Sequence, residues 1–187
     1  PGTSWNYSNT GYVVLACVAE AIDGQPFADI VQTRIAAPLG LTQFGILAPG
    51  ADHWVLPAAT TQPPSPADIA SLSGAGGLAA SPRDLLIFLH AHLTGQLVST
   101  GTLTSAFEEL HPMNGSPLFF GRGVMVFDVP DPLRPTLWLG HSGGSPDAKA
   151  LAVYDVQRGT FMVVTINVQA PAEAFANSLL KVLDEFP

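Results

Sequence analysis

Residues 140–144 read Gly-His-Ser-Gly-Gly, a run that joins an imidazole and a hydroxyl to glycines that let a substrate come close to the backbone. Two interpretations fit these residues. In the first, the Gly-x-Ser-x-Gly spacing makes Ser142 a nucleophile on a sharp turn between a strand and a helix. In the second, the run ends a strand and holds an acyl group that a different serine attacks. The two interpretations disagree about which oxygen attacks.

The order of the histidines along the chain decides between these interpretations. A nucleophilic serine on such a turn needs an imidazole that follows it in sequence. No histidine follows Ser142, since the histidines of the chain are His53, His90, His92, His111 and His141. The residues after the run also favour another strand, where the turn requires a helix. The sequence therefore favours the second interpretation, in which Ser142 binds substrate.

Helices are expected in the first part of the chain. Capping and turn signals predict four of them: residues 10–23 with Asn9 as the N-cap and Gly24 as the stop, residues 26–36, residues 81–95 with Ser81 as the cap and Asp84 in a capping-box pattern, and residues 103–110. The first two are expected to form a helical hairpin. In the first helix, Tyr12, Leu15, Ala16 and Ala19 fall at helical spacing. Residues 42–73 are rich in Pro, Ala and Thr and predict a long loop.

From Phe119 onward the sequence pattern favours strands. Strands are predicted over residues 119–129, 136–144, 148–156 and 159–168, with a hairpin turn at 157–159. A closing helix over 171–186 carries an apolar stripe of Phe175, Leu179, Leu183 and Phe186, which we expect to cover one sheet face. The predicted class is α+β, in a single domain of residues 1–187: a mainly helical part over 1–115, and an antiparallel sheet with its helix over 116–187.

Composition excludes several classes of protein. Hydrophobic residues make up 47% of the chain and charged residues 12%, which is typical of a globular core. The net charge of −8 and the lack of a Lys/Arg run argue against a nucleic-acid partner. The longest apolar run, Val13–Ala19, is far shorter than the ~20 residues of a membrane span. Cys17 lies in that run and is expected to be buried. No metal or cofactor is expected, and no compartment is indicated.

Six stretches, in one consistent order, resemble a known family. They are PGTSWNYSNTGY at 1–12, IAAPLGL at 35–41, SGAGGLAASPRDLLIFL at 73–89, FGRGVMVF at 120–127, GHSGG at 140–144, and the last strand pair with its helix. Together they are similar to the C-terminal two thirds of the serine β-lactamase-like superfamily. The most similar branch holds class C β-lactamases, D-alanyl-D-alanine carboxypeptidases and related esterases. The resemblance implies a β-lactamase/transpeptidase-like fold.

The resemblance gives roles to two residues near the start of the chain, Tyr7 and Asn9, which match the family's Tyr-x-Asn motif. A phenol ordinarily has a pKa of ~10, so it accepts a proton readily only where a nearby cation stabilises its anion. Tyr7 is therefore implied to be a general base or proton relay beside a lysine. Asn9 is implied to hydrogen-bond an amide on the acyl side of the substrate. Asn9 is also the expected helix cap, and the sequence does not separate these two roles.

The family's third motif, Lys-Thr-Gly or its histidine variants, falls on His141, Ser142 and Gly143. His141 is implied to supply a positive charge or a hydrogen bond to a substrate carboxylate. Ser142 and Gly143 are implied to bind substrate, and the N–H of Gly144 to be one donor of the oxyanion hole. The alternative for the two glycines is a β-bulge or a strand end.

The family's first motif, Ser-x-x-Lys, supplies the nucleophile and precedes Tyr7. The one Ser-x-x-Lys here, Ser178–Lys181, lies on the closing helix and is interpreted as a coincidental match. We therefore expect an N-terminal segment of the same protein to complete the fold. In its absence, a sheet edge and an apolar face should be exposed.

The function implied for the full-length protein is acyl transfer to water through an acyl-enzyme. The substrates implied are D-alanyl peptides, β-lactams or small esters, and the histidine variant favours an esterase or peptidase. The alternative is a catalytically silent relative that binds peptidoglycan-like or acyl ligands, or a partner protein.

Overall fold

The computed structural model describes residues 5–47, 73–113, 117–130, 135–145, 148–168 and 170–185. It combines helices with an antiparallel sheet, so the predicted α+β class is confirmed. The described residues before Leu85 form one compact unit and those from Leu85 onward a second. This boundary lies before residue 115, where the sequence predicts the change from helices to strands. The reason is that most of the third predicted helix, and the whole of the fourth, belong to the same unit as the sheet.

The first unit opens with helix α1 (Asn9–Asp23), whose N-cap is Ser8. Ser8 has extended backbone angles, and its Oγ accepts a hydrogen bond of 3.3 Å from the N–H of Gly11. The predicted cap, Asn9, was therefore wrong by one residue, because Asn9 already belongs to the helix. The predicted stop at Gly24 is confirmed by its φ of 68° and by its N–H, which donates to the carbonyl of Glu20.

Helix α1 buries only one residue, Ala16. An added Cβ at Gly74 would lie 2.6 Å from the Ala16 side chain, so the backbone of this segment packs directly against the helix there. The two neighbours of Ala16 in the chain are exposed, Leu15 to 60%. The prediction that Cys17 is buried was therefore wrong.

The second predicted helix is a continuous helical run with a π-helical middle. It comprises α2 (Phe27–Val31), η1 (Gln32–Ala36) and α3 (Ala37–Leu39), and it ends at Gly40, whose φ is 65°. The end predicted at Ala36 was three residues early. The N–H of Phe27 donates to Glu20 Oε1 at 2.8 Å, which ties the start of this run to α1 and forms the predicted helical hairpin.

A two-stranded antiparallel sheet in the first unit was not predicted. Strand β1 (Phe44–Ile46) pairs with β2 (Leu78–Ala80). The loop predicted over 42–73 was therefore wrong at β1, and its remainder over 48–72 lies outside the described residues. Three-residue strands are too short to show a period in the sequence.

Helix α5 (Pro82–Leu93) begins with the predicted cap, since Ser81 Oγ accepts a hydrogen bond of 3.2 Å from the N–H of Asp84. The other half of the capping box does not form. The Ser81 N–H donates to the carbonyl of Gln43, and the Asp84 carboxylate accepts from the N–H of Gln43 at 2.6 Å. These bonds fasten the helix start to the segment before β1. Helix α6 (Thr100–Ser105) is capped by Ser99, so it begins and ends earlier than the predicted 103–110.

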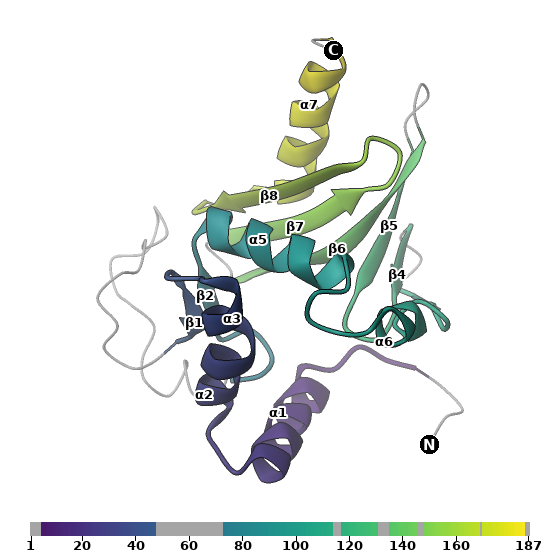
Figure 1. Ribbon diagram of the computed structural model, residues 1–187. Helices are drawn as coiled ribbons and strands as arrows, with labels where there is room; N and C mark the ends of the chain where they lie inside the picture. The colour runs from purple at the N-terminus through teal and green to yellow at the C-terminus, as the bar shows by residue number, and fades with distance from the viewer. Residues whose placement is uncertain are drawn as a thin grey trace. The chain divides into compact units, whose positions relative to one another are not determined.

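The second unit is built on a six-stranded antiparallel sheet of order β3-β4-β5-β6-β7-β8 (Figure 1). The strands are β3 (His111–Pro112), β4 (Leu118–Phe120), β5 (Met125–Val129), β6 (Thr136–Ser145), β7 (Ala148–Asp155) and β8 (Thr160–Ile166). The predicted strands are present, except that the first of them is a hairpin of β4 and β5. The hairpin between β7 and β8 turns where predicted, with Gly159 at a φ of 64°. Strands β3 and β8 are the two edge strands of this sheet in the described part of the chain.

Helix α7 (Ala172–Glu185) packs through a different face from the one predicted. Its buried residues are Ala172, Ala176 and Leu180, a row at every fourth position. The predicted stripe is the exposed face, with Phe175 52%, Leu179 53% and Leu183 56% exposed, while Phe186 lies outside the described residues. Alanines allow the helix backbone to approach the sheet closely, which explains the choice of face. This exposed apolar row belongs to the helix, whereas the face predicted to be exposed belongs to the sheet, so that expectation stays a prediction.

The core of the second unit contains a buried carboxylate, Asp155, at the turn end of β7. Its oxygens accept hydrogen bonds of 2.9 Å from Thr136 Oγ1, Trp138 Nε1 and both the backbone and the guanidinium of Arg158. Burial alone would raise the pKa of Asp155, but these four donors outweigh it and hold that pKa below its ordinary value. Arg158 also bonds Asp184 of α7 at 2.6 Å, so the network anchors the helix to the sheet.

In the described part of the chain, no helix combines the length and the apolar character needed to cross a bilayer.

Candidate active site

The run Gly140–Gly144 lies where strand β6 extends beyond its neighbour β5. Strand β5 pairs with β6 only from Thr136 to Gly140, whereas β7 pairs with it as far as Ser145. Residues 141–145 therefore have no strand on one side in the described part of the chain. Backbone groups of alternate residues face the same edge of a strand, so Ser142 and Gly144 share an edge. Because β7 follows and no helix does, the turn that would make Ser142 a nucleophile is absent here.

His141 is fixed by its own strand. Its Nδ1 lies 2.6 Å from the carbonyl oxygen of Ser142, and the Phe120 ring meets its ring edge-on at a centroid distance of 5.7 Å. Burial lowers the pKa of His141, and the bond to the Ser142 carbonyl raises it by less. The imidazole is therefore mainly neutral at pH 7, with Nδ1–H donating to the carbonyl and Nε2 left as an acceptor. Of the two roles in the sequence prediction, this geometry favours hydrogen bonding over a fixed positive charge.

The two glycines after Ser142 are regular strand residues, paired with Ala150 and Lys149. The alternative of a β-bulge is therefore not what the structure shows. An added Cβ at Gly144 would lie 2.7 Å from Lys149 Cδ and 3.0 Å from its Cα, so the two strands leave no room for a side chain there. At Gly143 an added Cβ would meet nothing within 4 Å. Gly144 is thus required by packing, and Gly143 leaves an open surface.

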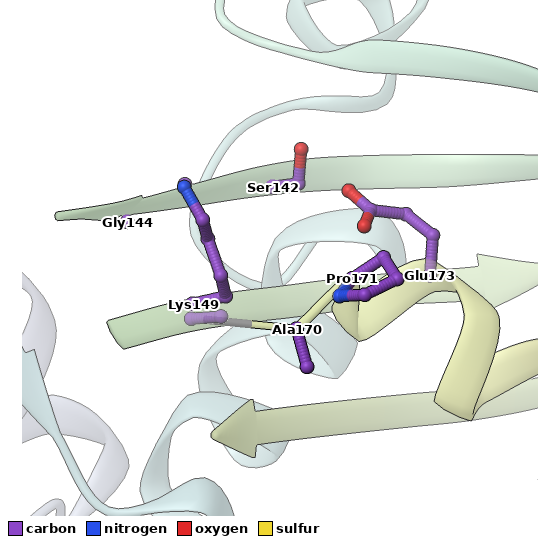
Figure 2. A pocket seen from close by; sticks show the side chains of 8 residues that line it. Ser142, Gly144, Lys149, Ala170, Pro171 and Glu173 are labelled. Carbon is purple, nitrogen blue, oxygen red and sulfur yellow. The ribbon is translucent and has the colours of Figure 1, made fainter. Parts of the chain in front are cut away.

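A pocket of about 500 Å³ lies beside these residues, entirely within the second unit (Figure 2). It is lined by Ser142, Gly143, Gly144, Lys149, Ala150, Ala170, Pro171 and Glu173. The hydroxyl of Ser142 faces it, and Oγ is 3.8 Å from the sulfur of Met125. Figure 2 shows the side chains of Lys149 and Glu173 extending toward β6 on either side of that hydroxyl.

Lys149 and Glu173 were missed by the sequence analysis. For Lys149 a signal existed, because pairing the strands on either side of 145–147 in hairpin register places it opposite Gly144. For Glu173 none existed, because only the packing of α7 on the sheet brings its first turn to the pocket.

Tyr7 and Asn9 lie together in the first unit. They flank the cap residue Ser8, and the Tyr7 ring is half-buried against Tyr12, at a centroid distance of 6.1 Å. Since Ser8 caps α1, the side chain of Asn9 is not needed for that role. The structure thus groups the predicted residues into two sets, one at the start of α1 and one on β6. That the two sets share one cavity stays a prediction.

The Ser-x-x-Lys match on α7 has none of the features of a nucleophile. Ser178 and Lys181 are exposed, and Ser178 Oγ donates to the carbonyl of Ala174 at 2.9 Å within the helix. Neither residue lines the pocket beside β6. Among the described residues, no three His, Cys, Asp or Glu side chains are grouped so as to hold a metal ion.

Comparison with known proteins agrees with this arrangement. The family model described as Beta-lactamase matches residues 1–184. A penicillin-binding protein of Bacillus subtilis (strain 168) is 26% identical over 97% of the chain. The structure of a D-stereospecific amidohydrolase from Streptomyces sp. superposes with a TM-score of 0.72 at 25% identity, covering 89% of this chain and 51% of that one.

A more distant structure shows the fold alone. The octameric penicillin-binding protein homologue from Pyrococcus abyssi has a TM-score of 0.77 at 21% identity, over 98% of this chain and 43% of that one. The chain spans 43% and 42% of the length of the two curated Bacillus subtilis relatives that it matches.

Proposed function

Because the chain belongs to the beta-lactamase family, we propose that it forms the substrate-binding and oxyanion-stabilising part of a serine acyl hydrolase. The proteins similar to it include a penicillin-binding protein and a D-stereospecific amidohydrolase. The observation that carries the proposal is the free edge of β6 at 141–145, beside a pocket. An extended acyl substrate can pair with such an edge by main-chain hydrogen bonds.

In the proposed mechanism, the nucleophile is a serine of a Ser-x-x-Lys motif in the segment before Tyr7. Tyr7 accepts the proton of that hydroxyl and passes it to the leaving group. The serine oxygen bonds to the acyl carbon, the bond to the leaving group breaks, and water later cleaves the acyl-enzyme by the reverse proton transfer. This scheme needs no metal or cofactor.

The residues of β6 serve the acyl group. In this proposal the N–H of Gly144 faces the free edge of β6 and donates to the oxygen that becomes negative in the transition state. Such a donor typically contributes ~3 kcal/mol to transition-state stabilisation. The neutral His141 is held by the Ser142 carbonyl and fixes the conformation of the strand end. Its Nε2 accepts a hydrogen bond from a donor group of the substrate. Asn9 and Ser142 hydrogen-bond the acyl side.

Among the substrates of this family, the chain favours esters and amide-linked D-amino acid derivatives over β-lactams. The neutral His141 stands where a permanently charged lysine is usual, so attraction for a β-lactam carboxylate is weaker at this position. An amide substrate is also suggested by the likeness to the D-stereospecific amidohydrolase.

The test is turnover of a chromogenic ester and of D-alanine p-nitroanilide by the full-length protein. We expect Tyr7→Phe to lower kcat by about 10²–10⁴-fold, the usual contribution of a positioned general base. The matched control is Tyr154→Phe on β7, where the hydroxyl is removed from a tyrosine whose ring packs at a tilt against Phe161. Unchanged turnover in Tyr7→Phe would remove Tyr7 from the mechanism. A wild-type protein with no turnover would favour a catalytically silent binding protein.

A further inference from the structure

The pocket beside β6 holds two opposite charges that are not paired with each other. The carboxylate of Glu173 and the ammonium of Lys149 both line it. Among the described residues, neither side chain takes part in a salt bridge or side-chain hydrogen bond. In Figure 2 the Glu173 side chain extends toward Ser142, and the Lys149 side chain reaches β6 near Gly144, on the other side of Ser142. Two unlike charges separated in this way match a ligand that carries both charges itself.

The surroundings of the two charges are otherwise weakly polar. Apart from Ser142, the remaining lining residues are glycine, alanine and proline, with no further charged group. A ligand in the pocket thus has one cationic partner, one anionic partner and small apolar walls. This favours a compact molecule whose charged groups are close together.

We propose that this pocket is a subsite for the zwitterion of a small α-amino acid, with its ammonium on Glu173 and its carboxylate on Lys149. The proposal rests on the proposed function in one respect: the amino acid would be the leaving group of an amide substrate, or an acceptor that competes with water for the acyl-enzyme. Small walls select small side chains. The pocket lies beside the Gly144 backbone, where a group released from the acyl carbon first arrives.

A purely structural role exists for each residue and must be separated from binding. Glu173 is in the first turn of α7, where a carboxylate stabilises a helix through its favourable interaction with the helix dipole. Glu173→Asp keeps that charge but shortens its reach by one methylene. This variant should therefore keep the wild-type melting temperature and still bind an amino acid more weakly, a combination that a helix-stabilising role alone does not produce.

Equilibrium binding to the full-length protein tests the proposal with three probes: alanine, which carries both charges, alaninamide, which keeps the ammonium, and N-acetylalanine, which keeps the carboxylate. Both enantiomers are titrated by NMR or calorimetry. We expect alanine to bind about tenfold more tightly than either singly charged probe, in line with one charged hydrogen bond. Glu173→Gln should reduce alanine to the affinity of N-acetylalanine, and Lys149→Gln should reduce it to that of alaninamide.

The matched controls are Glu185→Gln and Lys181→Gln, which remove the same charges from exposed positions on α7 outside the pocket. They should leave binding unchanged. Equal affinity of the three probes for the wild-type protein, or equal losses in the control and pocket variants, would overturn the proposal. Binding needs no turnover, so the results are separable: charge-dependent binding without ester hydrolysis would keep the subsite and reject the hydrolase, and hydrolysis without such binding would do the reverse.

Discussion

Strands β6 and β7 have very different chemistry at their two ends. The end next to the turn between β7 and β8 is called the turn end. There the buried carboxylate of Asp155 receives four hydrogen bonds, and Arg158 links it to α7. At the other end, β6 runs past β5, and the nearby charges of Lys149 and Glu173 are not paired with each other. One end satisfies its polar groups internally. The other leaves them available to a ligand, so stability and binding are separated along the same pair of strands.

Helix α7 connects these two ends. Its last turn bonds Arg158 through Asp184, and its first turn places Glu173 in the pocket. Its 14 residues span about 21 Å, close to the roughly 20 Å from Lys149 to Asp155 along β7. The anchored end thus fixes where the binding end lies.

The largest expected effect is on stability, at the turn end. Asp155→Ala leaves the guanidinium of Arg158 without its buried partner and removes the acceptor of Thr136 and Trp138. We expect a loss of about 3–5 kcal/mol in the free energy of unfolding, the usual result of breaking a buried pair. Urea denaturation measures it. The matched control is Asp128→Ala on the neighbouring strand β5, an exposed aspartate whose loss should change stability by less than about 0.5 kcal/mol.

Acid should weaken the same network. The pKa of Asp155 is lowered in the folded state, so its contribution to stability is complete above the unfolded value of ~3.9 and is lost as the pH falls through the folded value. The wild-type protein should lose stability below about pH 4 more steeply than Asp155→Ala. Parallel acid profiles for the two proteins would contradict this assignment.

The second effect is on activity, at the other end of the strands. Gly144→Ala forces β6 away from the Lys149 backbone and moves the N–H proposed for the oxyanion hole. We expect kcat/KM of the full-length protein to fall by about 10²–10³-fold, the usual result of losing such a donor. Gly143→Ala introduces the same methyl group into open space and should fold with wild-type stability. Equal stability and equal activity of the two variants would contradict the close approach at Gly144.

The smallest expected effect is a shift in the pH at which His141 titrates. Because burial lowers the pKa of His141, its ring proton shift in NMR should titrate below the ordinary value of ~6.5. The neutral state should persist at pH 7 and give way to the cation only in more acidic solution. A midpoint above 6.5 would mean that His141 serves as a positive charge after all.

The sequence was most informative where one residue decides a local structure. Glycines at 24 and 159 predicted a helix end and a hairpin turn, and both have positive φ. Ser81 predicted the start of α5. Prediction failed where packing decides. The apolar stripe of α7 suggested a buried face, but the alanine row packs on the sheet because it allows a closer approach.

The candidate site divides in the same way. The GHSGG run predicted a site at this end of β6 because its glycines and polar residues are unusual in a buried strand, and three of its residues line the pocket. Glu173 could not be predicted, since its place in the pocket depends on α7 being anchored at Asp184, far along the helix. Likewise, Ser8 replaced Asn9 as the cap because both residue types cap helices well and the backbone angles alone choose between them.

The most direct test of the proposed chemistry is to locate the reactive serine. The full-length protein is treated with a fluorophosphonate, its intact mass is measured, and the adduct is mapped to a peptide. We predict one adduct, on the serine of a Ser-x-x-Lys motif that precedes Tyr7, with Ser142 and Ser178 unmodified. An adduct on Ser142 or Ser178, or no adduct on the folded protein, would contradict the assignment of β6 as the wall that binds substrate beside a separate nucleophile.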